Sequence, residues 1–104
     1  MSLSSDQKKR FRTIAHHLKP VVIIAEKGIS EGVLTELERA LEDHELIKLK
    51  INVAEREDKQ LIIGEVVEKT HAELVQTIGK VAVLYRAAKK QNPKLSNLMR
   101  FQAL

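Results

Sequence analysis

The chain of 104 residues has no cysteine and no tryptophan, and its only aromatic side chains are Phe11, Tyr85 and Phe101. Without cysteine it can form neither a disulfide nor a thiolate metal site, so packing alone must stabilise the fold. Three aromatic residues are too few for a platform on which successive bases stack. A nucleic acid would therefore have to be held through its backbone and its shape.

Long apolar runs are also missing. No segment approaches the roughly 20 apolar residues that span a bilayer. The first residues lack the apolar region of a signal peptide. We therefore expect a cytoplasmic protein with no membrane partner.

The length and the hydrophobic fraction of 43% suit one domain with a core, and 104 residues are too few for two. We expect this domain to span residues 1–88 and to be a monomer. Residues 89–104 contain a proline, polar residues and little periodicity. They predict a basic C-terminal tail that is partly disordered.

Charge is unevenly distributed along the chain. Residues 1–20 carry +4, residues 86–104 carry +5, and residues 21–85 carry −5. If both ends lie on one side of the fold, they form a positive patch that attracts a polyanion in a salt-dependent manner. Basic ends are equally typical of solvated termini, so charge alone favours neither interpretation.

Hydrophobic periodicity predicts three helices and four strands in one two-layer α/β domain. Ser4 and Gln7 have capping-box spacing, Ser30 caps a second helix, and Gly79-Lys80 forms a two-residue hairpin turn. Right-handed crossovers then give a four-stranded mixed sheet with the order α-β-α-β-α-β-β. The expected elements are a helix from Ser4 to about Leu18, a strand over 20–25, a helix from Ser30 to about His44, a strand over 46–53, a helix that follows 55–59, and strands over 73–78 and 81–86.

Three local predictions accompany this order. Apolar residues on both faces of the strand at 20–25 predict burial on both sides. Leu61 is expected on the buried side of the third helix. The hairpin turn places Glu73 opposite Arg86, where the two would form an exposed ion pair.

The segment over residues 20–30 predicts an anion site. An apolar strand leads through a short loop that contains Lys27 and Gly28 into a helix capped by Ser30. Free amides and the positive end of the helix dipole then face outward, and phosphate is the obvious anion. The alternative is that Gly28 only makes the turn.

Further candidate phosphate contacts lie near both ends of the chain and on the strands. Lys48 and Lys50 share one strand face, where they could equally prevent edge-to-edge association. With Lys27, the candidate contacts are Lys8, Lys9, Arg12, Lys48, Lys50, Lys80, Arg86, Lys89 and Lys90.

Catalytic and metal-binding patterns are not found in the sequence. His44 is expected to end a helix, where its imidazole stabilises the helix dipole or bonds the last carbonyls, and no second ligand lies three or four residues away. His16 and His17 are adjacent and point in different directions on a helix. The chain has no nucleophile triad, phosphate-binding loop of the Walker type or dinucleotide fingerprint. We therefore expect no enzyme, no cofactor and no metal site.

Several separated motifs occur in order over about residues 3–87: Leu18-Lys19-Pro20-Val21-Val22, Gly28-Ile29-Ser30, His44-Glu45-Leu46-Ile47-Lys48, Val75-Gln76-Thr77-Ile78-Gly79-Lys80 and Val83-Leu84-Tyr85-Arg86. Together they resemble the CRM domain, named for chloroplast RNA splicing and ribosome maturation, and its bacterial single-domain YhbY-type members. The resemblance implies a fold similar to the C-terminal domain of translation initiation factor three. It also implies RNA binding without catalysis and association with precursors of the large ribosomal subunit.

In that family the loop after the first strand usually carries a G-x-x-G pattern, likened to the loop by which KH domains clamp nucleotides. Here the four positions read Ala25-Glu26-Lys27-Gly28. The first glycine is missing, and the carboxylate beside it repels phosphate by about 1 kcal/mol at 4 Å even in water. We therefore carry over Lys27 and Gly28 and exclude Glu26.

Two functional hypotheses follow. In the first, the protein binds ribosomal RNA of the 23S type in large-subunit precursors during ribosome assembly, through a basic surface around residues 25–30. In the alternative, it is a protein-interaction module, in which apolar surface on the open side of the sheet docks a ribosomal protein or assembly factor. Release of the partner by RNase would separate the two.

Overall fold

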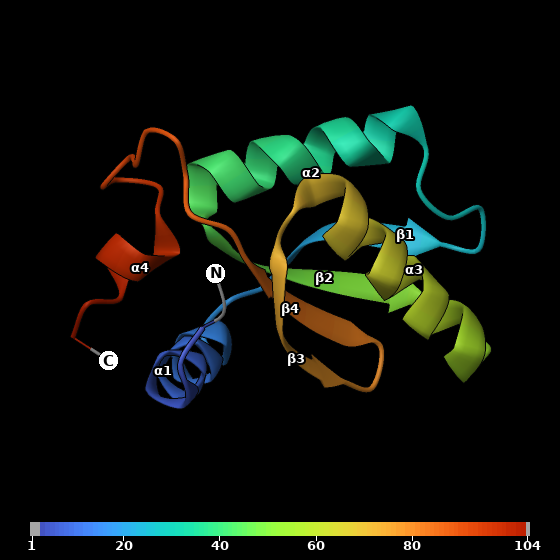
Figure 1. The fold of residues 1–104 in the computed structure, drawn as a ribbon, viewed down its shortest axis with the longest axis horizontal. Helices are drawn as coiled ribbons and strands as arrows, with labels where there is room; N and C mark the ends of the chain where they lie inside the picture. The colour runs from blue at the N-terminus through green and yellow to red at the C-terminus, as the bar shows by residue number, and fades with distance from the viewer. Residues whose placement is uncertain (1–2, 104) are drawn as a thin grey trace.

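The computed structural model describes residues 3–103, and its helices and strands follow the predicted order (Figure 1). One short helix is added after the last strand. None of the helices in the described part of the chain has the length and apolar character needed to cross a bilayer. The elements are α1 (Ser5–Ala15), β1 (Pro20–Ala25), α2 (Glu31–His44), β2 (Leu46–Asn52), α3 (Arg56–Thr70), β3 (Glu73–Ile78), β4 (Val81–Tyr85) and α4 (Asn97–Arg100).

The four strands form one mixed sheet in the order β1-β2-β4-β3. β1 runs parallel to β2, and the other two pairs are antiparallel. This arrangement confirms the predicted α/β fold with a mixed sheet. It also leaves β1 and β3 as the two edge strands.

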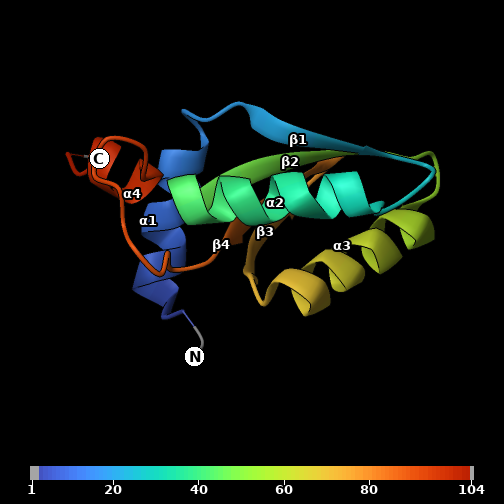
Figure 2. The same cartoon turned by 90° about the horizontal axis from the view of Figure 1, so that it is seen from above.

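The two faces of the sheet are covered unequally. α2 and α3 lie on one face, where Ile24, Leu41, Ile51 and Leu84 belong to the main core. α1 packs on the other face only near one end of the sheet, with α4 beside it (Figures 1 and 2). The face that carries α1 therefore stays open over the rest of its length.

This unequal cover corrects the expectation that β1 is buried on both sides. Val22 and Ile24 are buried toward α2 and α3, whereas Val21 and Ile23 are 45% and 62% exposed. Alternate residues of a strand point to opposite faces. Within residues 3–103, the helices on this face, α1 and α4, pack against β2 and β3 and leave Ile23 uncovered. Ile23 therefore contributes to a surface instead of a core.

The helix signals are mostly confirmed. Ser4 and Gln7 form the expected capping box, and the Ser30 hydroxyl accepts a hydrogen bond of 3.1 Å from the Val33 amide. α2 ends at His44, as predicted. The prediction that Leu61 is buried is wrong, because its side chain is 72% exposed. The buried stripe of α3 instead consists of Ile62, Ile63, Val66 and Thr70.

The hairpin turn is also as predicted, with Ile78 opposite Val81, but the register changes further along. A β-bulge between Leu74 and Gln76 shifts the pairing by one residue, so Glu73 lies opposite Tyr85. The predicted ion pair between Glu73 and Arg86 is therefore wrong.

The C-terminal segment packs against the rest of the fold through buried polar residues. Ser96 and Asn97 are buried at its centre. The Ser96 hydroxyl donates to a Glu45 carboxylate oxygen at 2.7 Å, and the Asn97 side-chain amide donates to the Leu46 carbonyl at 2.7 Å. These anchors are polar and separated by some 50 residues in sequence, so hydrophobic periodicity does not predict them.

The Glu45 carboxylate accepts three of the hydrogen bonds that hold the C-terminal segment. Besides the bond from Ser96, it accepts hydrogen bonds from the Ala88 amide at 2.8 Å and from the Gln91 side chain at 2.6 Å. Burial raises the pKa of the Glu45 carboxyl, but the bonds from Ala88, Gln91 and Ser96 outweigh it and hold the pKa below its ordinary value. The ionised carboxylate is therefore the form that holds the C-terminal segment.

Candidate nucleic-acid interface

The predicted anion loop joins β1 to α2. Gly28 has a φ of +76°, and its amide donates to the Ala25 carbonyl at 2.9 Å, so it makes the turn. A Cβ at Gly28 would meet no atom within 4 Å. The left-handed backbone, and not close packing, is therefore what favours glycine here. The Ser30 hydroxyl is used by the helix cap.

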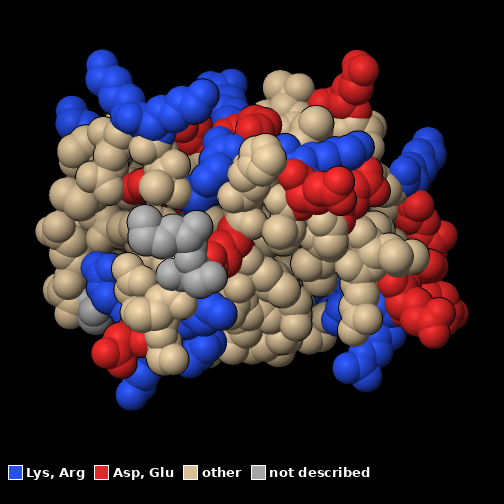
Figure 3. Space-filling model, viewed as in Figure 1, with Lys and Arg blue, Asp and Glu red and all other residues tan. Residues whose placement is uncertain are grey.

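A groove beside this loop is acidic. It has a volume of about 390 Å³, and Glu26, Asp58 and the exposed Leu61 line it together with Gly28. Figure 3 shows acidic side chains gathered on the right of the view, over the start of α3. Two carboxylates in one groove repel phosphate, so Lys27 lies in a poor setting for RNA.

The face of the sheet that carries α1 has the opposite character. We call its uncovered part the open sheet face and define it by outward residues of the four strands: Ile23, Lys48, Lys50, Gln76, Ile78 and Val81. Lys50 lies between Ile23 and Val81 in the strand register, and Val81 lies opposite Ile78. The face thus alternates exposed aliphatic side chains with lysines, without a carboxylate among these positions.

A groove runs along the open sheet face beside α1. Its volume is about 160 Å³. Arg12 and Lys48 supply two cations, and neither of them takes part in the ion pairs found within residues 3–103. The described residues that line it include no Asp or Glu: Arg12, Ala15, His16, Lys48, Gln76, Ile78, Val81 and Val83.

A second groove of about 220 Å³ continues from the first on the other side of Lys48. It lies between the end of α1, the start of β1 and α4. Lys19 and Arg100 make it basic, and Arg100 lies 5.5 Å from the centroid of the Phe101 ring. The two grooves are adjacent, because Lys48 lines both of them.

The predicted contacts are only partly brought together. Arg12 and Lys48 line the same groove, and Lys50 lies two residues beyond Lys48 on the same face of β2. Lys8 lies one helical turn before Arg12, on the same side of α1. The remaining predicted lysines lie elsewhere: Lys9 on α1, Lys27 in the loop, Lys80 at the hairpin turn, and Lys89 and Lys90 beside α2.

Lys80, Lys89 and Lys90 form hydrogen bonds within the protein, through the side chain of Lys80 and the backbone amides of the other two. The Lys80 ammonium is 3.3 Å from the Asn52 side-chain oxygen. The backbone amides of Lys89 and Lys90 each donate to Glu42 at 3.1 Å, although both side chains are exposed. These two bonds lower the pKa of the Glu42 carboxyl.

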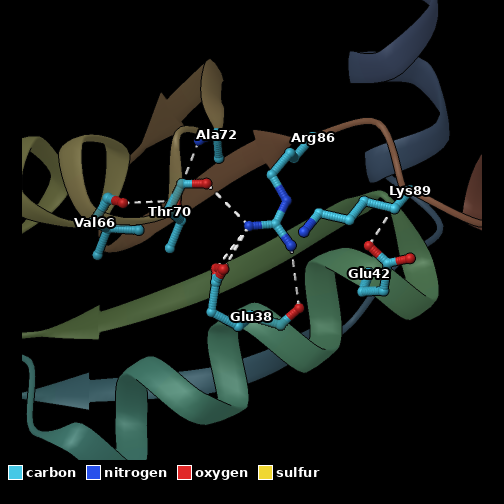
Figure 4. Close-up of polar contacts among 7 residues, drawn as sticks. All are labelled: Glu38, Glu42, Val66, Thr70, Ala72, Arg86 and Lys89. Atoms are coloured by element: carbon cyan, nitrogen blue, oxygen red, sulfur yellow. Dashed lines mark hydrogen bonds and ion pairs between the residues drawn. The ribbon is translucent and has the colours of Figure 1, made fainter.

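Arg86 stands apart from the other predicted contacts. Its guanidinium donates to both Glu38 carboxylate oxygens at 2.7 Å and to the Thr70 carbonyl at 3.0 Å (Figure 4). The Arg86 side chain is only 21% exposed. It therefore joins the end of β4 to α2 and α3, and we do not include it among the RNA contacts.

Sequence reasoning named Arg12 and Lys48 as contacts but missed the other six members of the first groove, which are Ala15, His16, Gln76, Ile78, Val81 and Val83. The two-residue hairpin turn already predicts that Gln76, Ile78 and Val81 share a face, because it pairs Ile78 with Val81 and Gln76 with Val83, as the structure does. It could not show that α1 leaves this face open. Among residues 3–103 no group of His, Asp or Glu side chains has the geometry of a metal site.

The chain is similar to one protein family and to proteins that are named for RNA binding. The family described as CRS1 / YhbY (CRM) domain matches residues 3–86. A Pseudomonas aeruginosa protein named a probable RNA-binding protein is 53% identical over 104 residues, which is the full length of both chains. A Haemophilus influenzae RNA-binding protein is 50% identical over 94 residues, covering 90% of this chain and 95% of its own. The solution structure of a Staphylococcus aureus protein, described as a candidate RNA-binding protein, matches with a TM-score of 0.74 at 35% identity, covering 86% of this chain and 93% of that one.

Proposed function

The chain belongs to the CRS1/YhbY (CRM) domain family, and from this premise we propose that it is a noncatalytic RNA-binding protein that binds through the open sheet face and α1. Relatives that are 53% and 50% identical are named for RNA binding. The observation that carries the proposal is the acid-free groove in which Arg12 and Lys48 lie together. Such a groove attracts a polyanion.

The charges of this surface are available to a ligand. The ion pairs found within residues 3–103 involve Arg39, Lys69 and Arg86, so Arg12 and Lys48 are not neutralised by them. Each phosphate bound by such a cation releases a counterion, which makes affinity fall as salt rises. RNA binding by this face should therefore be strongly salt-dependent.

We further propose that the RNA is ribosomal RNA of the 23S type and that the protein acts on large-subunit precursors in the cytoplasm. The resemblance of its motifs to the bacterial members of the family supports this assignment. The open sheet face supports the RNA part of the assignment, because cationic side chains bind the phosphate backbone of a folded RNA.

The test is ultraviolet crosslinking of the full chain to RNA in its own cells, with sequencing of the RNA and identification of the crosslinked peptides from one sample. We expect one region of large-subunit ribosomal RNA and peptides from α1, β2 or β3. Crosslinks confined to residues 25–30 would move the site to the loop. RNA drawn evenly from all transcripts would contradict the ribosomal assignment.

Protein docking on the same face is the competing outcome. Ile23 and Ile78 are 62% and 58% exposed, which is the kind of surface that a protein partner covers. RNase treatment of a purified assembly particle decides between the two. Release of the protein supports direct RNA binding, whereas retention on the ribosomal proteins would overturn it.

A further inference from the structure

The groove beside α1 has walls of two chemical kinds. Ile78 and Val81 provide aliphatic surface on one side, and Arg12, His16 and Lys48 provide polar and charged groups around it. Its volume of about 160 Å³ is far above the roughly 15 Å³ that one water needs. We propose that this groove binds a single unpaired base of the RNA, an inference that rests on the proposed function and names the RNA feature it recognises.

Gln76 is the residue that gives the groove its ability to read a base. Its side-chain amide offers both a donor and an acceptor. The side-chain hydrogen bonds found within residues 3–103 do not include it. An amide placed beside an apolar wall suits the edge of a base, which also presents donors and acceptors, and is not needed to bind phosphate alone.

The aliphatic wall suits the flat side of a base. Ile78 is 58% exposed, and Val81 lies opposite it in the hairpin register. Neither aromatic ring of the nearby pair, Phe11 and Tyr85, lines this groove. The base would therefore pack against methyl groups, and its site requires a nucleotide that is already out of a helix.

The cations at the groove favour the phosphates that flank such a base. Lys48 belongs to both grooves, so a strand that leaves the first groove can continue into the second toward Lys19 and Arg100. The described residues lining the two grooves include no carboxylate. The predicted ligand is thus an unpaired nucleotide within a folded RNA, such as a bulge.

The experiment compares two labelled RNA hairpins that are identical except for one bulged nucleotide, by fluorescence anisotropy with the full chain at fixed salt. We expect the bulged hairpin to bind about tenfold more tightly. Gln76→Leu should reduce the ratio of the two affinities about fivefold through the lost hydrogen bonding. Thr77→Ala is the matched control, because the neighbouring Thr77 points to the other face of β3.

A second readout does not depend on how well the variant folds. A photoreactive uridine at the bulge of the wild-type complex should crosslink to peptides from β3, β4 or α1. Equal binding of both hairpins, an undiminished preference in Gln76→Leu, or crosslinks only to the loop at 25–30 would overturn the base site and leave RNA binding intact. Failure to bind either hairpin would overturn the proposed function itself.

Discussion

Two surfaces of this protein carry candidate phosphate contacts, and they differ in what surrounds those contacts. At the loop, Lys27 is next to a groove that contains Glu26 and Asp58. On the open sheet face, Arg12 and Lys48 share a groove without a carboxylate among its described lining residues. The local motif is present only at the first surface, whereas a favourable electrostatic environment is present only at the second.

Magnitudes explain why the environment outweighs the motif. A helix N-terminus contributes about half a positive charge. Lys27 adds one full charge, but Glu26, Asp58 and Glu31 in the first turn of α2 each add a negative one. The net charge around the loop is therefore negative. A strand-loop-helix motif predicts an anion site only when the charges of the surrounding residues are also known.

The largest expected effect comes from removing the charges of the open sheet face. We predict that Lys48→Gln with Lys50→Gln weakens binding to a large-subunit ribosomal RNA fragment about 100-fold, because two charged contacts are lost. The slope of log affinity against log salt should also fall by about 1.5. Filter binding at a series of salt concentrations measures both quantities.

The matched control removes the same charge elsewhere. Lys89→Gln with Lys90→Gln takes two exposed lysines from the segment beside α2 and leaves their backbone bonds to Glu42 in place. We expect less than a threefold change in affinity for this pair, as for screened charges away from the ligand. An equal loss in both double variants would show that net charge, and not the open sheet face, binds the RNA.

The second prediction separates a structural cation from a binding one. Arg86→Ala leaves Glu38 and the Thr70 carbonyl without their shared donor, so we expect the free energy of unfolding to fall by about 2 kcal/mol. RNA affinity of the folded variant should stay within twofold. Urea unfolding and filter binding measure the two.

Arg39→Ala is the control for Arg86. Arg39 forms a pair of 3.9 Å with Asp43, and its side chain is 85% exposed. Removal of such a surface pair should cost less than about 0.5 kcal/mol. A large loss of RNA affinity in Arg86→Ala, without a loss of stability, would return Arg86 to the binding surface.

Much of the fold could be predicted because its signals are local. Ser4 and Ser30 cap their helices, and Gly79 starts the hairpin turn where the sequence places it. Alternation identifies β2, and helical spacing identifies α2. These features need only neighbouring residues, so no knowledge of the tertiary fold is required.

The errors arise where long-range packing decides. Leu61 has the right residue type for a core, but the stripe of α3 that meets the sheet is one position away. The bulge before Gln76 changes the hairpin register without a proline or glycine to mark it. At the site, the sequence predicted Arg12 and Lys48 as separate contacts. They share a groove with Ile78 because α1 covers only one end of the sheet, and that position of α1 could not be predicted from the sequence.

The third prediction concerns the C-terminal segment, which carries Arg100 into the second groove. At neutral pH, Glu45→Gln should lower the free energy of unfolding by about 1 kcal/mol, because charged acceptors bind Ser96 and Ala88 more strongly than neutral ones. Hydrogen exchange should show faster opening of residues 88–101. RNA affinity should fall only slightly.

The contribution of Glu45 to the free energy of unfolding should decrease as the pH falls. Its pKa in the folded protein lies below the ordinary value of 4.5, so the carboxylate stabilises the fold above that pH. The stabilisation is lost as the pH falls through the lower, folded-state pKa. The difference in stability between wild type and Glu45→Gln should therefore be full at pH 7 and shrink at pH 3. A constant difference would contradict the role of the ionised form.

The smallest effects are expected at the loop, and they test the comparison most directly. Lys27→Gln and Glu26→Gln should change RNA affinity in opposite directions, each by only about two- to threefold, because both side chains are exposed and screened by solvent. The first variant removes attraction and the second removes repulsion. Filter binding at low salt, where such weak terms are largest, measures both. If Lys27→Gln instead weakened binding as strongly as the Lys48 and Lys50 double variant, the loop would be the main anchor despite Glu26 and Asp58, and RNA would have to approach from the side of the loop that faces away from their groove.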